Sequence, residues 1–370
     1  MNVKSLIFCI PLLLVFEVYG QPEIGSIKAN QYNLSSSGKE FIMNEAQHAS
    51  FLLLGELHGE REIPDLIFAL WAQLHQIGYE HIAAEVSPWA AQKLEFGTGD
   101  DSLKQEVLWS NREAKFVHLK RATIVNPTVW GCDMEEISVD KEITLLAKIN
   151  HGDSIITKAA FMVRDNYSRE KASSILKVLT GYHPQKDSLL NGISLYDNIK
   201  SSLIIDSLRA LPAEKLEAQI MRENLMKKYF LTRYNNLTAK DGTKVFLRFG
   251  RNHLHKGFDD RGISTLGNFV TELAFSKGLK SFNIAAFAAG GKYTLLEETD
   301  DADETGDDIA LAFLSKQADY SETIFDLRPL RIVLHQISSE QRSDLQKRLM
   351  YWADSYDAII CYKKVTPFYH

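Results

Sequence analysis

The sequence has 370 residues, of which 45% are hydrophobic and 24% are charged, which is the composition of an ordinary globular protein. The composition therefore excludes a chain that is disordered throughout. The formal net charge of -6 is spread over both signs without a basic stripe, which argues against nucleic acid as a partner. We expect a small-molecule substrate and no required cofactor. The sequence does not indicate the oligomeric state.

Residues 1–20 predict a secretory signal peptide. Lys4 is followed by an apolar run over residues 6–18, and Gly20 precedes the expected cleavage point. The mature chain, residues 21–370, is then exported to the periplasm or secreted. An uncleaved N-terminal membrane anchor is the alternative. No later segment approaches the roughly 20 apolar residues that a membrane span needs, so we expect no stable span after cleavage.

Short apolar runs alternate along the chain with longer amphipathic stretches. The runs are rich in β-branched and aromatic residues and predict strands, whereas the amphipathic stretches predict helices. This alternation is typical of an α/β fold with a mainly parallel β-sheet flanked by helices. The expected strands are residues 51–56, 81–86, 129–133, 244–249, 281–288, 322–327 and 358–363, and clear helices are expected at 64–76 and 265–275.

A large helical insert is expected at about residues 136–240 of the single α/β domain. The strand pattern disappears there, and successive helices are predicted at residues 144–149, 172–179, 190–208 and 213–234. Two placements are open, because the insert could cover the carboxyl edge of the sheet as a lid or pack as a layer on one face.

A carboxylate and an imidazole follow the strand at residues 51–56. The segment LLGELHG places Glu56 and His58 two residues apart, and such residues lie on the same side of an extended chain. His58 titrates near neutral pH and could take a proton from water, while a nearby carboxylate would stabilise the resulting charge. We therefore predict that this pair acts on one water molecule or one substrate atom.

Three further predicted strands run into acidic or imidazole groups. Glu85 ends the strand at 81–86, Asp133 ends the strand at 129–133, and the strand at 244–249 continues to His253 and His255. In an open parallel sheet the carboxyl ends of the strands line the ligand crevice, so these groups should converge. Glu85 has apolar neighbours, and a charge there costs free energy unless it is paired or used.

Each of the weaker candidates has a structural alternative. Arg61, Asp133 and His255 are predicted substrate contacts, with Arg61 binding an anion or clamping Glu85. Arg61 could instead form a surface ion pair, and Asp133 could cap the following helix. The alternative for His255 is to face solvent, because only one of the two histidines should point into the cleft. Residues 222–224, in a predicted helix, are interpreted as a solvated polar face.

Several segments resemble the erythromycin esterase-like proteins. They are LLGELHGEREIPDL, GYEHIAAEVS, VWGCDME, MRENL, GTKVFLRFGRNHLHKG, TLGNFVTELA and YDAIICYKKVTP, in the order and spacing of that family. The resemblance implies a hydrolase that attacks an ester, lactone or amide with a histidine-activated water and without a required metal. It implies His58 as the general base, Glu56 and Glu85 as its electrostatic partners, and His253 as the second histidine of the cleft.

One spacing difference keeps two other functions open. Only Leu57 separates Glu56 from His58, a shorter form that resembles haem-binding iron-uptake proteins and metal-dependent proteases of the same broad superfamily. The first alternative is a hydrolase with a divalent metal bound by Glu56, His58, Glu85 and His253. The second is a non-enzymatic protein that binds haem or another bulky ligand in the same cleft. Aromatic residues would pack against that ligand, or they would belong to the core instead: Tyr229, Phe230 and Tyr234.

Overall fold

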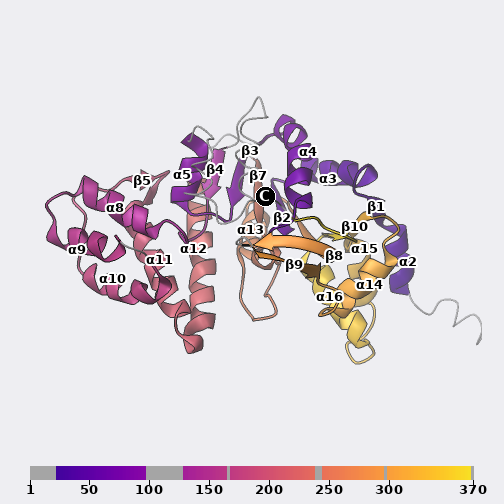
Figure 1. The fold of residues 1–370 in the computed structure, drawn as a ribbon. Helices are drawn as coiled ribbons and strands as arrows, with labels where there is room; N and C mark the ends of the chain where they lie inside the picture. Colours follow the sequence, from indigo (N-terminus) through magenta and orange to yellow (C-terminus); the bar gives the residue numbers. More distant parts are fainter. Residues whose placement is uncertain (1–21, 97–127, 165–166, 238–243, 296–297, 368–370) are drawn as a thin grey trace, which may run out of the picture.

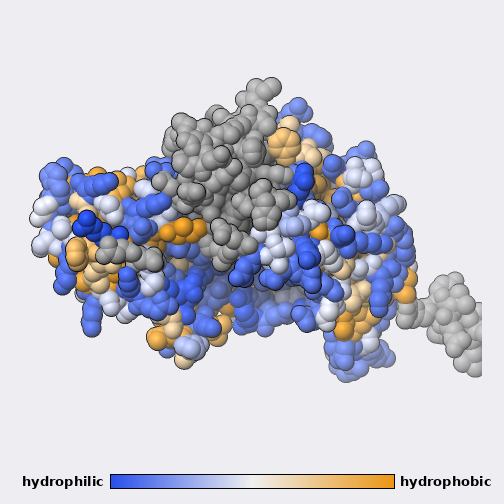
Figure 2. All heavy atoms as spheres, in the orientation of Figure 1, coloured by the Kyte–Doolittle hydropathy of each residue, from blue (hydrophilic) through white to orange (hydrophobic). Residues whose placement is uncertain are grey.

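The computed structural model describes residues 22–96, 128–164, 167–237, 244–295 and 298–367 (Figure 1). The predicted signal peptide lies outside these residues. Within the described part of the chain, no helix is both long enough and apolar enough to cross a membrane. Figure 2 shows that hydrophilic residues dominate the visible described surface, where hydrophobic residues occur in small separate areas.

A nine-stranded sheet organises the fold. Its order is β1-β10-β11-β8-β2-β7-β3-β4, with β9 pairing with β8. All neighbours from β11 to β4 are parallel, whereas β1, β10 and β9 pair antiparallel, so the predicted mainly parallel sheet is confirmed. The strands are β1 (Gln31–Asn33), β2 (Phe51–Glu56), β3 (Tyr79–Ala84), β4 (Thr128–Gly131), β7 (Lys244–Gly250), β8 (Ser281–Leu295), β9 (Glu298–Asp303), β10 (Glu322–Asp326) and β11 (Ala358–Tyr362).

Apolar side chains on both faces of the sheet bury two separate cores. Phe51 and Leu53 point to one core and Leu52 and Leu54 to the other, because successive residues of a strand face opposite sides. One face is covered by α3 (Ser37–His48) and α4 (Glu62–Gln76). The other is covered by α12 (Lys215–Asn235), α13 (Leu266–Ser276), α14 (Ile309–Gln317), α15 (Arg328–His335) and α16 (Asp344–Ser355), with α2 (Pro22–Ala29) against α14 and α15.

The helices between β4 and β7 divide into two parts. A lobe at one end of the molecule has its own apolar core and contains α8 (Val139–Ile149), α9 (Ser154–Val163), α10 (Ala172–Val178) and α11 (Leu195–Arg209), which pack with α5 (Pro88–Phe96) (Figure 1). The last helix, α12, packs on the sheet instead, with the Phe230 ring against Phe51 and Trp130. This helix lies as a layer on one face of the sheet, which was one of the two open placements.

Candidate functional site

Four adjacent parallel strands bring the candidate residues to one edge of the sheet. β2, β7, β3 and β4 are neighbours in that order, so their carboxyl ends lie side by side. Glu56 ends β2, Gly250 ends β7, Glu85 directly follows β3, and Asp133 lies two residues beyond β4. The convergence expected from strand ends is therefore present in the structure.

The imidazole of His58 lies between two carboxylates. Its Nδ1 is 3.5 Å from Glu56 Oε1, and its Nε2 is 3.6 Å from Glu85 Oε2. Glu56 is held in place by buried Arg248, whose Nε donates a hydrogen bond of 2.8 Å. The His58 side chain is 26% exposed, and its Nδ1 has no hydrogen bond to any described residue. The ring is thus accessible, and both carboxylates would stabilise a positive charge on it.

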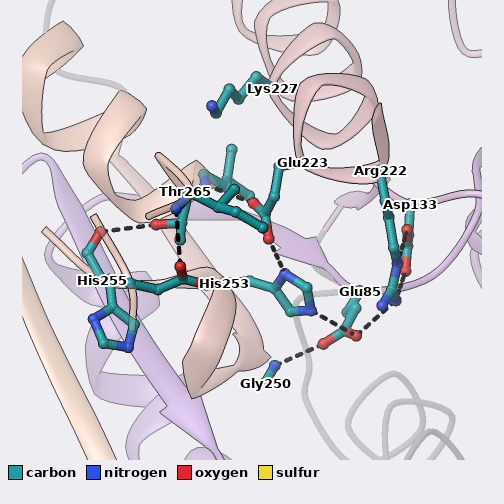
Figure 3. A network of polar contacts seen from close by, with 12 residues as sticks. Glu85, Asp133, Arg222, Glu223, Lys227, Gly250, His253, His255 and Thr265 are labelled. Carbon is teal, nitrogen blue, oxygen red and sulfur yellow. Dashed lines mark hydrogen bonds and ion pairs between the residues drawn. The ribbon is translucent and has the colours of Figure 1, made fainter. Parts of the chain in front are cut away.

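Glu85 is the centre of a buried polar network (Figure 3). It accepts hydrogen bonds from the Gly250 amide at 2.6 Å and from Arg222 Nη2 at 2.9 Å, and it lies 3.4 Å from His253 Nε2. Burial by itself would raise the pKa of Glu85, but His253, Arg222 and the Gly250 amide outweigh burial and lower that pKa to about 2. Glu85 is therefore an anion at neutral pH.

His253 is bound on both sides by carboxylates. Its Nδ1 donates to Glu223 Oε1 at 2.5 Å, while Glu223 Oε2 accepts from the Leu266 amide at 3.0 Å. Burial alone would lower the pKa of His253, but Glu223 and Glu85 raise it to about 10. His253 is consequently a buried imidazolium, which cannot accept a proton from water at neutral pH.

Arg222 joins the ends of β3 and β4. Its Nε donates to Asp133 Oδ1 at 2.9 Å, and its Nη2 contacts both Asp133 and Glu85. Asp133 also accepts from the Met134 amide at 2.8 Å. Asp133 therefore binds the arginine and does not cap a helix, since α8 begins later, with Ser138 at its N-cap.

Both Arg222 and Glu223 come from α12, and interpreting them as a solvated face was wrong. Glu223 is fully buried and the Arg222 side chain is 13% exposed, whereas Asn224 is exposed, as interpreted. A signal was present in the sequence, because Glu223 lies three residues before Met226 and seven before Phe230, on the apolar stripe that packs against the sheet. A glutamate on such a stripe requires a buried partner, and here that partner is His253.

A small cavity of about 40 Å³ adjoins this network and is lined by residues that include Glu85, Asp133 and Arg222. Ser87 and Glu135 also line it, and the Ser87 hydroxyl donates to the Glu135 carboxylate. A volume of this size holds a few water molecules beside charged groups that can orient them. The carboxylates and the guanidinium therefore adjoin a space suited to small polar molecules.

Two predicted substrate contacts lie elsewhere. His255 neither contacts the cleft nor faces solvent: it is buried among Tyr351, Trp352 and Tyr356, and its ring points away from His253 (Figure 3). Burial lowers the pKa of His255 to about 4. Arg61 forms the surface ion pair given as its alternative, to Asp65 at 3.1 Å, with its side chain 59% exposed.

Glu85 is clamped by Arg222 rather than by Arg61. Tyr229 and Phe230, the aromatic residues considered for a bulky ligand, belong to the core beneath α12. The Tyr229 hydroxyl donates to Asn198 at 2.9 Å, and Phe230 contacts other aromatic rings. These two side chains therefore pack in the core and do not line a site for a bulky ligand.

The residues proposed for a divalent metal do not fit one in this arrangement. Glu56 and Glu85 accept hydrogen bonds from arginine side chains, and both ring nitrogens of His253 lie next to carboxylates, Glu223 and Glu85. In the described ranges, no group of three or more His, Cys, Asp or Glu side chains is placed to hold a metal ion. The charges of the cluster are arranged to neutralise one another.

The pKa shifts of His253 and Glu85 predict how stability depends on pH. The pKa of His253 is raised from 6.5, so its stabilising contribution is complete below pH 6.5 and is lost as pH rises through about 10. The pKa of Glu85 is lowered from 4.5, so its contribution is present above pH 4.5 and is lost as pH falls toward 2. Urea unfolding across pH should show these two declines.

Replacing Glu223 with glutamine provides the matched test of the alkaline decline. The amide keeps the size of the side chain but removes the charge that raises the pKa of His253. The loss of unfolding free energy between pH 6.5 and 10 should become shallower in this variant, while the acid decline persists. An identical alkaline slope in the variant would show that Glu223 does not stabilise the imidazolium.

The described residues form a mainly parallel α/β fold that several solved structures share. No protein-family model and no curated protein matches the sequence. The solved structures that it resembles include a Bacillus cereus protein, with a TM-score of 0.60, 14% identity, and coverage of 94% of this chain and 98% of that chain. The predicted resemblance is confirmed at the level of the fold.

Two further solved structures share this architecture. One is a succinoglycan biosynthesis protein, with a TM-score of 0.55 and 14% identity over 94% of this chain and 97% of that chain. The other is a mutant of the erythromycin esterase EreC in its open conformation, with a TM-score of 0.55 and 14% identity over 88% of this chain and 93% of that chain. At this identity the likeness concerns the fold alone.

Proposed function

We propose that the protein is an exported hydrolase that attacks an ester, lactone or amide with a water molecule activated by His58. The observation that carries this proposal is the difference between the two histidines of the cluster. His58 is partly exposed between Glu56 and Glu85 and is available to water, whereas His253 is a buried cation bound by Glu223 and Glu85.

The proposed reaction follows from these positions. Water donates a proton to His58 as its oxygen bonds to the substrate carbonyl carbon, and Glu56 and Glu85 stabilise the imidazolium that forms. The tetrahedral intermediate then collapses, and the proton passes from His58 to the leaving oxygen or nitrogen. Arg222 lines the small cavity beside Glu85 and is the cation that we assign to the oxyanion.

Hydrolysis of a panel of aryl esters and macrolide lactones tests this function. The purified protein is assayed before and after treatment with a chelator. Turnover that survives the chelator supports attack by histidine-activated water, and turnover that disappears and returns with added metal supports the metal-dependent alternative. No turnover of any member of the panel would contradict the assignment as a hydrolase of these bonds.

Export is part of the proposal. It rests on the sequence pattern of residues 1–20 alone, because these residues lie outside the described structure. We expect that the protein recovered from outside the cytoplasm begins at or near Gln21. N-terminal sequencing of that fraction measures this directly. Full-length protein retained in the cytoplasmic fraction would contradict it.

Gly250 offers a way to disturb His58 without removing a polar group. A Cβ at this position would lie 2.6 Å from His58 Nε2 and 3.2 Å from Glu85 Oε2. Gly250→Ala should therefore displace the imidazole, and kcat is expected to fall about tenfold or more through misplacement of the base. The matched control is Gly25→Ala, because no atom lies within 4 Å of an added Cβ there and the backbone φ is not positive.

Equal activity in Gly250→Ala and the wild type would show that the position of the His58 ring does not limit the reaction. Unfolding free energies of both variants are measured in parallel. A loss of activity that merely follows a loss of folded protein would not count as support.

A further inference from the structure

A second and larger pocket lies at the same edge of the sheet. It has a volume of about 330 Å³, which is within the range of small-molecule sites. The first turns of α3 and α4 and the ends of β10 and β11 supply its polar lining: Lys39, Arg61, Glu62, Asp65, Glu322 and Tyr362. Glu322 and Tyr362 are register partners on adjacent antiparallel strands, so their side chains share one face.

The loop that carries His58 leads directly into this pocket. Glu62 lies four positions after His58, which limits the distance between their Cα atoms to roughly 14 Å. The Arg61 amide donates to the Thr366 carbonyl at 3.0 Å, and Glu62 Oε1 accepts from the Thr366 amide at 2.9 Å. These bonds fix the loop to the wall of the pocket, so one elongated molecule could contact both places.

Two buried polar atoms of the lining have no hydrogen-bond partner in the described part of the chain. They are the hydroxyl of Tyr362, a residue that is only 2% exposed, and Oε2 of Glu62. A buried donor or acceptor that lacks a partner costs free energy, and a ligand that supplies hydrogen-bond donors would recover it. Both atoms can accept a hydrogen bond, which favours a donor-rich ligand group.

The charges of the lining favour a cation. Arg61 is paired with Asp65, which leaves two carboxylates, Glu62 and Glu322, against the single cation Lys39. Burial, followed by repulsion from Glu62, raises the pKa of Glu322. A positive group placed near both carboxylates would relieve that repulsion.

We propose that this pocket binds a protonated amine carried by the substrate, so that the enzyme prefers amine-bearing esters, lactones or amides. This inference rests on the proposed function, because it assigns a substrate class to the hydrolase. The amine lies against Glu62, Glu322 and Tyr362 while the bond to be cleaved lies at His58.

Two matched substrates test the preference. They are p-nitrophenyl ε-aminocaproate and its uncharged isostere p-nitrophenyl heptanoate. In Glu322→Gln, KM for the aminocaproate should rise about tenfold, the effect of losing one charged hydrogen bond, with kcat unchanged. Tyr362→Phe should raise the same KM by a smaller factor. The heptanoate carries no charge for Glu322 or Tyr362 to bind, so its KM should not show this rise in either variant.

Glu80→Gln is the matched control, because Glu80 is an exposed carboxylate on β3, outside the pocket lining. It should leave both substrates unaffected. If Glu322→Gln and Tyr362→Phe alter neither KM, or alter the KM of both substrates equally, the amine site is wrong even though hydrolysis stands.

Binding measured without turnover separates the two proposals. Hexylammonium chloride and hexanol are titrated into His58→Ala by calorimetry and by NMR. Binding of hexylammonium alone, weakened by Glu322→Gln, supports the amine site even if no ester is hydrolysed by the wild type. Failure of hexylammonium to bind, together with equal turnover of the two esters, would overturn the amine site and leave the hydrolase assignment intact.

Discussion

Replacing His58 with alanine is expected to lower kcat for ester hydrolysis by about a thousandfold, the usual contribution of a positioned general base. The variant removes the accessible imidazole between Glu56 and Glu85, and His253 cannot replace it, because it is already protonated at neutral pH. The loss should appear in kcat rather than in KM, since the base acts on water during the chemical step.

The control for this prediction is His335→Ala. His335 is an exposed histidine of α15 that pairs with Asp354 on the surface, and its removal should leave kcat unchanged. Steady-state kinetics of the wild type and both variants provide the comparison. If kcat of His58→Ala stays within a factor of about three of the wild type, His58 is not the general base and another residue must take that role.

Replacing Arg222 with methionine is expected to lower the free energy of unfolding by about 3 kcal/mol or more. The substitution keeps much of the side-chain length but leaves Glu85 and Asp133 buried without the cation that joins them. Breaking a buried ion pair on one side is costly, because the remaining charges keep their desolvation penalty. Urea unfolding near pH 7 measures the difference.

Arg61→Met is the matched control for Arg222→Met. The Arg61–Asp65 pair is exposed, and its loss should cost no more than about 1 kcal/mol. Adding Asp133→Asn to Arg222→Met should recover part of the stability by removing one of the stranded charges. Equal and small effects of Arg222→Met and Arg61→Met would mean that the buried carboxyls take up protons when the arginine is absent.

The ends of the parallel strands could be predicted from sequence. Glu56, Glu85 and Asp133 each follow an apolar run, and parallel strands place such residues at one edge whatever the exact order of the sheet. The same reasoning brought His253 to the cluster. Strand β1 (Gln31–Asn33) was not predicted, because one aromatic residue between two amides is too short for an apolar pattern, and the strand is held by backbone pairing with β10.

The partners from α12 depended on information that a local pattern does not contain. Arg222 lies 137 residues from Glu85 along the chain, so the contact depends on how the insert packs. His255 was misplaced for a similar reason, since the rings that bury it belong to α16 and the residue that follows it. The position of His255, two residues after His253, gives no indication that rings of α16 would bury it.

The position of α12 has a consequence for the order in which the site acquires its charges. This helix brings Arg222 and Glu223 to the strand ends. The Arg222–Glu85 contact joins residues 137 positions apart and the Glu223–His253 contact joins residues 30 positions apart, so both require loop closure, which is slower for the longer loop. Before α12 docks, Glu85 lacks its arginine and His253 lacks one of the two carboxylates that raise its pKa. In a partly folded chain whose sheet is assembled before α12 docks, the pKa of Glu85 would therefore be higher and the pKa of His253 lower than in the native protein.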